Sequence, residues 1–142
     1  IIIRTIDYLK TRTSSKVKFS FEYNTGKPVV IPLNIALFEW VIENVFKNAI
    51  DSMEGSGELN IRLMESEKNA IIDISDTGKG IPKTAFKKIF NPGFTTKQRG
   101  WGLGLSLARR IIEEYHRGRI FVRSSELEKG SCIRILMNKG KH

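Results

Sequence analysis

Residues 76–105 read DTGKGIPKTAFKKIFNPGFTTKQRGWGLGL. This stretch holds two glycine clusters, with Asp76 directly before the first and a loop of Phe, Thr and Lys between them. Glycine has no Cβ, so the backbone there can adopt positive φ and approach a ligand closely. The second cluster opens onto apolar residues at helical spacing, and free N–H groups at a helix start suit phosphate. The stretch therefore predicts a nucleotide pocket between Asp76 and a glycine-capped helix.

The glycine clusters match neither of the common phosphate-binding loops. The chain contains no GxxxxGK[ST], and no GxGxxG that follows a strand and opens a helix. Two GxG units alone would fit two ordinary loops equally well. The nucleotide interpretation depends on how these units combine with polar residues upstream.

Composition narrows the class of protein. The chain has 142 residues, 40% hydrophobic and 27% charged, which suits one globular domain. The single cysteine, Cys132, excludes an internal disulfide and a multi-cysteine metal site. The net charge of +9 is spread along the chain, so we expect a polyphosphate ligand or an acidic protein partner and no nucleic acid. No apolar run is long enough for a membrane span, and no signal peptide is visible.

Apolar periodicity predicts an α+β two-layer sandwich, with a mixed, mostly antiparallel sheet of about five strands and helices on one face. Residues 1–12 are expected to be the end of a helix from an upstream domain and its linker, which the resemblance described below identifies as a dimerisation domain, and residues 13–142 a separate domain. Helices are predicted over 33–53 (capped by Asn34), 82–90 and 102–116. Strands are predicted over 16–23, 58–65, 68–76, 119–124 and 131–137. Residues 24–28 are predicted to form a turn.

The helix over 33–53 carries a polar stripe as well as an apolar face. Asn44, Asn48 and Asp51 stand at i, i+4 and i+7, which places two amides and a carboxylate on one side of the helix. Asn is a mediocre helix former, so its use in mid-helix suggests a purpose.

Together these motifs resemble the ATP-binding domain of bacterial sensor histidine kinases. The matching residues are Asn44 to Asn48, Asp76-x-Gly78-x-Gly80, Phe90-Asn-Pro-Gly-Phe94, and Gly100-x-Gly102-x-Gly104-Leu. That family calls them the N, G1, F and G2 boxes, and its superfamily, which includes DNA gyrase and MutL, shares the Bergerat fold. The resemblance covers about residues 16–137, and the boxes stand in the family's order.

The resemblance implies a role for each box. Asp76 would accept a hydrogen bond from the adenine amino group, and since an ionised carboxylate only accepts, ATP is expected over GTP. Asn48 would be the ligand of Mg²⁺, with Asn44 facing the phosphates and Lys97 reaching the γ-phosphate; these three are the expected catalytic residues. The residues expected to bind the cofactor ATP are Asn48, Asp51, Asp76, Gly78, Gly80, Ile81, Phe90, Thr95, Thr96, Lys97, Gly100, Gly102, Leu103, Gly104, Leu105 and Ser131.

Two departures from the family pattern bear on the chemistry. Many relatives have a basic residue where this chain has Asp51. Gyrase and MutL relatives use a Glu as general base four residues before the metal-binding Asn, and here that position is Asn44, whose amide cannot take a proton from water. The resemblance therefore implies phosphoryl transfer to a histidine on a separate, absent dimeric domain. His116 and His142 do not stand in such a context, so the chain alone should bind Mg-ATP and barely phosphorylate itself.

The implied partners are the upstream dimerisation and phosphoacceptor domain and a response regulator. The parent protein is expected to be a cytoplasmic or membrane-anchored homodimer, and this chain a cytoplasmic monomer. Two alternatives stay open at this point. One is a related serine kinase of the anti-sigma type, and the other is a non-enzymatic basic interaction module with a decayed nucleotide pocket.

Overall fold

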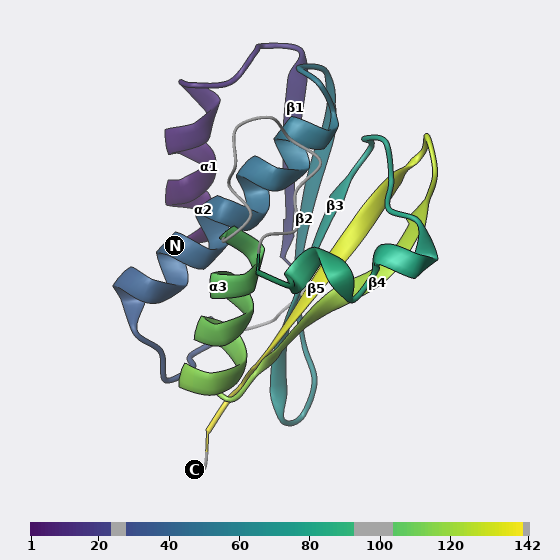
Figure 1. Cartoon of the computed structure of the whole chain (residues 1–142). Helices are drawn as coiled ribbons and strands as arrows, with labels where there is room; N and C mark the ends of the chain where they lie inside the picture. The colour runs from purple at the N-terminus through teal and green to yellow at the C-terminus, as the bar shows by residue number, and fades with distance from the viewer. Residues whose placement is uncertain (24–27, 93–103, 141–142) are drawn as a thin grey trace.

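The protein folds as a five-stranded sheet with its helices on one face (Figure 1). The structure is a computed structural model, and it describes residues 1–23, 28–92 and 104–140. The strand order is β1-β2-β3-β5-β4, in which β1 and β2 run parallel and the other neighbours antiparallel. The strands are β1 (Val17–Tyr23), β2 (Gly57–Glu65), β3 (Asn69–Asp76), β4 (Arg119–Glu126) and β5 (Gly130–Asn138). The helices are α1 (Ile2–Lys10), α2 (Ile35–Ser52) and α3 (Gly104–Arg110). The predicted α+β sandwich is confirmed.

The core lies between the sheet and the helices because the strands place apolar residues at alternate positions on the face that the helices cover. Leu59 and Ile61 on β2 and Ile72 and Ile74 on β3 point toward the helices and are buried. α2 meets them with an apolar face that is fully buried at Ile42. α2 crosses the middle of this layer in Figure 1, between α1 and α3. The remaining side of α2 does not pack against the sheet.

The ends of α2 follow from its sequence. The Asn34 side chain accepts a hydrogen bond from Leu37 N at 3.0 Å, as the predicted cap requires. The imidazole of His116 adds a second contact, because its Nε2 accepts from Asn34 N at 3.0 Å. Past the helix, Glu54 and Gly55 have φ of 53° and 93°, which turns the chain into β2.

Two predicted helices differ from the structure. The segment 82–90 forms two short 3₁₀ turns, η1 (Lys83–Ala85) and η2 (Lys88–Phe90), so the single helix predicted there is wrong. Short connecting segments satisfy their backbone with i→i+3 bonds, as between Ala85 N and Pro82 O at 2.8 Å. The last helix continues from α3 into a π-helical turn, η3 (Ile111–Tyr115). The predicted turn over 24–28 falls almost wholly outside the described residues.

α1 packs its apolar side onto the same domain. Ile2, Ile6 and Leu9 are buried in the core, whereas Ile3 is 61% exposed. The assignment of residues 1–12 to an upstream unit stays a prediction. Within the described ranges, no helix is long and apolar enough to cross a membrane.

The opposite face of the sheet carries an ion pair at its centre. Asp73 on β3 is 4% exposed, and Arg134 on β5 donates to its two oxygens at 2.7 and 2.8 Å. Arg123 approaches the same carboxylate at 3.6 Å. The hydrogen bonds to Asp73 raise the pKa of Arg134 against the opposing effect of burial.

Candidate functional site

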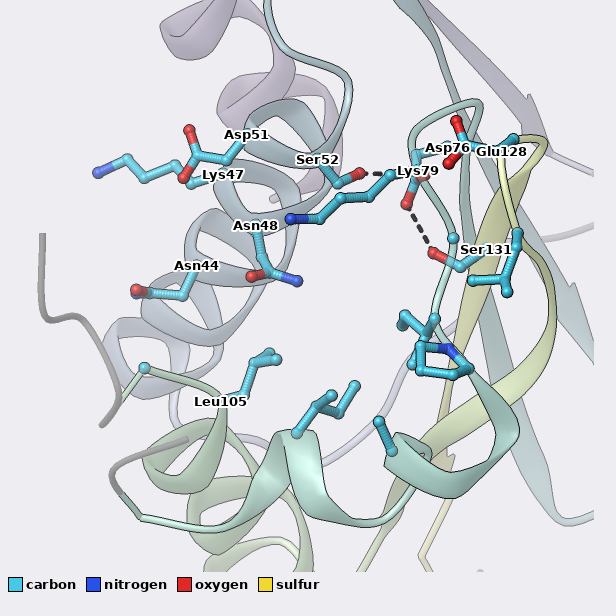
Figure 2. A pocket seen from close by; sticks show the side chains of 17 residues that line it. Asn44, Lys47, Asn48, Asp51, Ser52, Asp76, Lys79, Leu105, Glu128 and Ser131 are labelled. Atoms are coloured by element: carbon cyan, nitrogen blue, oxygen red, sulfur yellow. Dashed lines mark hydrogen bonds between the residues drawn. The ribbon is translucent and has the colours of Figure 1, made fainter. Parts of the chain in front are cut away.

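A cavity of about 540 Å³ opens between α2, the loop after β3, the 3₁₀ turns, the start of α3 and the β4–β5 hairpin (Figure 2). This volume is typical of small-molecule sites. Asn44, Asn48 and Asp51 line it from α2, and Asp76 and Ser131 line it from the sheet. The full lining is Asn44, Lys47, Asn48, Asp51, Ser52, Asp76, Lys79, Gly80, Ile81, Pro82, Ala85, Ile89, Gly104, Leu105, Leu127, Glu128 and Ser131.

The carboxylate of Asp76 is held at one end of the cavity by groups from three elements. Gly78 N donates to Oδ1 at 2.8 Å, and Ser131 Oγ on β5 donates to Oδ2 at 3.0 Å. Ser52 Oγ on α2 lies 3.2 Å from Oδ1 and 2.9 Å from Ala49 O, so its single proton serves one acceptor at a time. Asp76 and Ser131 are direct partners across the β3–β5 register. The carboxylate is therefore fixed in place and keeps accepting capacity for a donor in the cavity.

The glycines around Asp76 bring protein segments close to one another. A Cβ on Gly78 would lie 2.1 Å from Ser52 Oγ, and one on Gly130 (φ +130°) would lie 2.0 Å from Asp76 O. Gly80 has φ +79°, and a Cβ there would lie 2.5 Å from Glu126 O. These glycines let the loop after β3 pack between α2 and the β4–β5 hairpin. Gly80 also lines the cavity, whereas Gly78 faces the end of α2.

The polar stripe of α2 forms the opposite wall. In Figure 2 the Asn48 side chain points into the cavity, while Asn44 and Asp51 project from another side of the helix at the rim. Asn44 Nδ2 donates to Trp40 O at 2.8 Å, which fixes the direction of its amide. A Cβ built on Gly104 would lie 3.6 Å from Asn44 Oδ1, so the start of α3 comes close to this amide.

The floor of the cavity is apolar. Ile81, Ala85, Ile89, Leu105 and Leu127 line it, and Ala85 and Ile89 are also part of the buried core. A planar apolar ring can lie on such a surface while its edge meets Asp76, which is the arrangement that a purine would need.

The charges within the described lining are mixed. Asp51, Asp76 and Glu128 contribute carboxylates, and Lys47 and Lys79 contribute ammonium groups. Lys47 pairs with Glu43 at 3.1 Å, one helical turn earlier on α2. Among the described residues, no group of three or more His, Cys, Asp or Glu could hold a metal ion.

The structure brings together nine of the predicted site residues and leaves others elsewhere. Asn44, Asn48, Asp51, Asp76, Gly80, Ile81, Gly104, Leu105 and Ser131 all line the cavity. Phe90 is 4% exposed and lies in the core instead. The predicted contacts Thr95, Thr96, Lys97, Gly100, Gly102 and Leu103 lie outside the described residues, as do Phe94 and His142.

Sequence reasoning missed eight lining residues. Ser52 stands one turn after Asn48, so helical periodicity could have identified it. Leu127 and Glu128 reach the cavity because the hairpin folds over the loop, through a bond from Glu128 N to Lys79 O at 2.8 Å. No local spacing signals such a contact. The others are Lys47, Lys79, Pro82, Ala85 and Ile89.

Comparison with known proteins decides the family. A family model described as "Histidine kinase-, DNA gyrase B-, and HSP90-like ATPase" matches residues 34–141, well over half of the chain. The chain belongs to this family. As an ATPase-family domain it is similar to sporulation kinase D of Bacillus subtilis, with 36% identity over 121 residues that cover 85% of this chain and 24% of that protein. It is also similar to the sensor histidine kinase ZraS of Escherichia coli K12, at 41% identity over 66% of this chain and 20% of that protein.

Solved structures agree with these sequence relatives. The catalytic domain of the histidine kinase ThkA superposes with a TM-score of 0.87 at 27% identity, covering 97% of this chain and 90% of that one. ThkA has also been solved in complex with the response regulator TrrA, and that kinase chain matches at a TM-score of 0.81 and 28% identity over 98% of this chain and 40% of its own length. The predicted resemblance to catalytic domains of sensor histidine kinases is confirmed. The chain spans at most about a quarter of the length of the curated relatives named above.

Proposed function

We propose that this ATPase-family domain binds ATP with Mg²⁺ and serves a sensor histidine kinase, transferring the γ-phosphoryl group to a histidine on a separate helical domain. The group would pass next to a response regulator. The support for this step is that ThkA forms a complex with the response regulator TrrA. A cytoplasmic location for this domain, with a homodimeric parent and a monomeric isolated chain, is part of the proposal. The observation that carries it is a fixed carboxylate, Asp76, that faces the polar side chains of α2 across a cavity with an apolar floor.

Asp76 supplies the adenine contact in this proposal. Its oxygens already accept from Gly78 N and from the hydroxyl of Ser131, and a carboxylate has room for a further donor such as the adenine amino group. Guanine carries an oxo group at the same place, and a carboxylate repels it. The apolar floor, which includes Leu105 and Ile81, supports the flat face of the base.

The residues at the other end fit a magnesium ion bound together with phosphates. Mg²⁺ prefers hard oxygen ligands and commonly takes only one or two from the protein, with phosphate oxygens and waters in the other positions. Asn48 points its amide into the cavity and would be that ligand, which agrees with the lack of any dense metal-binding cluster among the described residues. The ion would neutralise charge on the triphosphate. Lys97 is proposed to reach the γ-phosphate.

The chemistry favours transfer to a protein over hydrolysis by water. Asn44 lies four residues before Asn48 and its amide donates to Trp40 O, so it offers no general base. Glu43 is engaged with Lys47 at 3.1 Å. Neither Asn44 nor Glu43 is therefore placed to activate water. Both observations fit a reaction in which another domain supplies the nucleophile and this domain positions the nucleotide and neutralises its charge.

The binding test is a titration with ATP and GTP in the presence of Mg²⁺. Asp76→Asn should weaken ATP binding by about 10- to 100-fold, the range for a lost charge-assisted hydrogen bond, and should reduce the preference over GTP. Asn48→Ala should weaken ATP binding only when Mg²⁺ is present. Asp7→Asn makes the same substitution at an exposed carboxylate on α1 and should leave the affinity unchanged. An unaltered affinity in Asp76→Asn contradicts the proposal, and a wild type that binds no ATP favours the non-enzymatic alternative.

The transfer test supplies labelled ATP and a helical phosphoacceptor domain in trans. The expected label is lost in acid and kept in base, as phosphohistidine is, and depends on the added domain. An acid-stable label on a serine would favour the anti-sigma type of kinase instead. Strong labelling of the chain alone would refute the proposed division between two domains.

A further inference from the structure

Lys79 stands between the two glycines of the first cluster, and its backbone is clamped on both sides. Lys79 N donates to Ser52 O at 3.2 Å, which ties it to the end of α2. Lys79 O accepts from Glu128 N at 2.8 Å, which ties it to the β4–β5 hairpin. A Cβ on Gly78 would meet Ser52 and one on Gly80 would meet Glu126, so the loop is closely packed on both sides. The backbone position from which the Lys79 side chain departs is therefore set by the fold.

The side chain leaves this anchor toward the cavity. In Figure 2 it runs from the Asp76 side toward α2, whose Asn48 lines the same cavity. A lysine has a long apolar stem and a compact charged head, so the stem can cover a base while the head reaches a charged group further on. The ammonium is directed to the end of the cavity that holds the proposed metal ligand.

The charges around the cavity indicate what role the Lys79 ammonium can have. Three carboxylates, Asp51, Asp76 and Glu128, line a site proposed to take a polyanion. Lys47, the other described lysine of the lining, has a side chain that is 54% exposed and pairs with Glu43. Asp51 adds negative charge at the rim of the phosphate end. The Lys79 ammonium enters the cavity from the wall opposite α2 and offsets this negative charge.

We propose that the Lys79 ammonium binds the phosphate chain of the bound nucleotide beside Asn48. This inference rests on the proposed function and adds to it a residue that determines affinity for the charged part of the ligand. Lys79 stands in the loop that directly follows Asp76, so a single segment would contact both the base and the phosphates.

The experiment is a calorimetric titration of the whole chain with ATP, ADP and adenosine in Mg²⁺ at about 0.15 M salt. Lys79→Met keeps most of the stem and removes the charge. It should weaken ATP binding about tenfold, as expected for one charged hydrogen bond in a partly open site, and change adenosine binding less than about twofold. Lys79→Arg should keep most of the ATP affinity. Lys83→Met is the matched control, because Lys83 is exposed and outside the cavity lining but carries the same charge.

The outcomes separate the two proposals. If the wild type binds ATP and Lys79→Met binds it equally well, the role of Lys79 is refuted while the proposed function stands. If Lys79→Met weakens adenosine as much as ATP, the side chain contacts the base or ribose and the phosphate contact is refuted. If Lys83→Met weakens ATP as much as Lys79→Met, general electrostatics explain the effect and the specific contact is refuted. A wild type that binds no ATP overturns the proposed function and this inference together. Thermal melts of each variant check that the fold is intact.

Discussion

Gly130 offers a sharp test of how the carboxylate of Asp76 is positioned. Gly130 has φ +130°, and a Cβ there would lie 2.0 Å from Asp76 O, whereas real Cβ contacts below 3.0 Å are essentially never seen. In Gly130→Ala the β3 and β5 backbones would have to separate by about 1 Å at this point. Positive φ costs a non-glycine residue about 1–2 kcal/mol, and a forced shift in a packed region costs about 1–3 kcal/mol. We expect a loss of about 2–5 kcal/mol in the free energy of unfolding.

Gly55→Ala is the matched control for this substitution. Gly55 also has positive φ, +93°, but a Cβ there would meet nothing within 4 Å. It should therefore show only the conformational cost of about 1–2 kcal/mol. The measurement is urea denaturation of both variants, with ATP titration alongside, because separation of the strands also pulls Ser131 Oγ away from Asp76 Oδ2. If Gly130→Ala is no less stable than Gly55→Ala and binds ATP as the wild type does, the steric reasoning is refuted.

Two further predictions concern stability away from the cavity. Arg134→Ala should cost about 3 kcal/mol by leaving the 4% exposed carboxylate of Asp73 without its main partner, and the double variant with Asp73→Ala should cost less than the sum of the single changes in urea denaturation. Additive losses would contradict this. His116→Ala should cost about 1–2 kcal/mol, because the ring accepts from Asn34 N at 3.0 Å and contacts Ile111 O at 2.9 Å. An unchanged melting temperature would show that neither contact matters.

The sequence predicted the parts of the site that depend on local spacing. Asn44 and Asn48 stand one helical turn apart and both line the cavity, although only the Asn48 side chain points into it, and Asp76 ends a strand whose alternation is plain in the sequence. The contribution of Leu127 was not predictable in this way, because it depends on a hairpin closing over a loop some fifty residues earlier in the chain. Over 82–90 the sequence predicts one helix where the structure has two 3₁₀ turns, because apolar spacing over so few residues fits both structures.

Gly78 shows the limit of reading a glycine as a ligand contact. Its spacing with Asp76 and Gly80 predicted a close approach of the backbone, and a close approach is found. The neighbour, however, is Ser52 at the end of α2, which in turn contacts Asp76. A glycine signals that something must come near, and only the tertiary structure says whether that is a ligand or another part of the chain.

Under the proposed function, the contacts of Asp76 imply that recognition of the base and stability of the fold are coupled in this domain. Its carboxylate is held from α2, from β5 and from its own loop, so changes that displace it, such as Gly130→Ala, should reduce affinity and stability together. Lys79 and Asn48 act through side chains that reach into the cavity, so their variants should lose affinity at nearly unchanged stability. Plotting ATP affinity against unfolding free energy for these variants should therefore give two separate groups. One common line through all of them would mean that every loss of binding reflects a general loosening of the fold, and the division of the cavity into a base end and a phosphate end would be wrong.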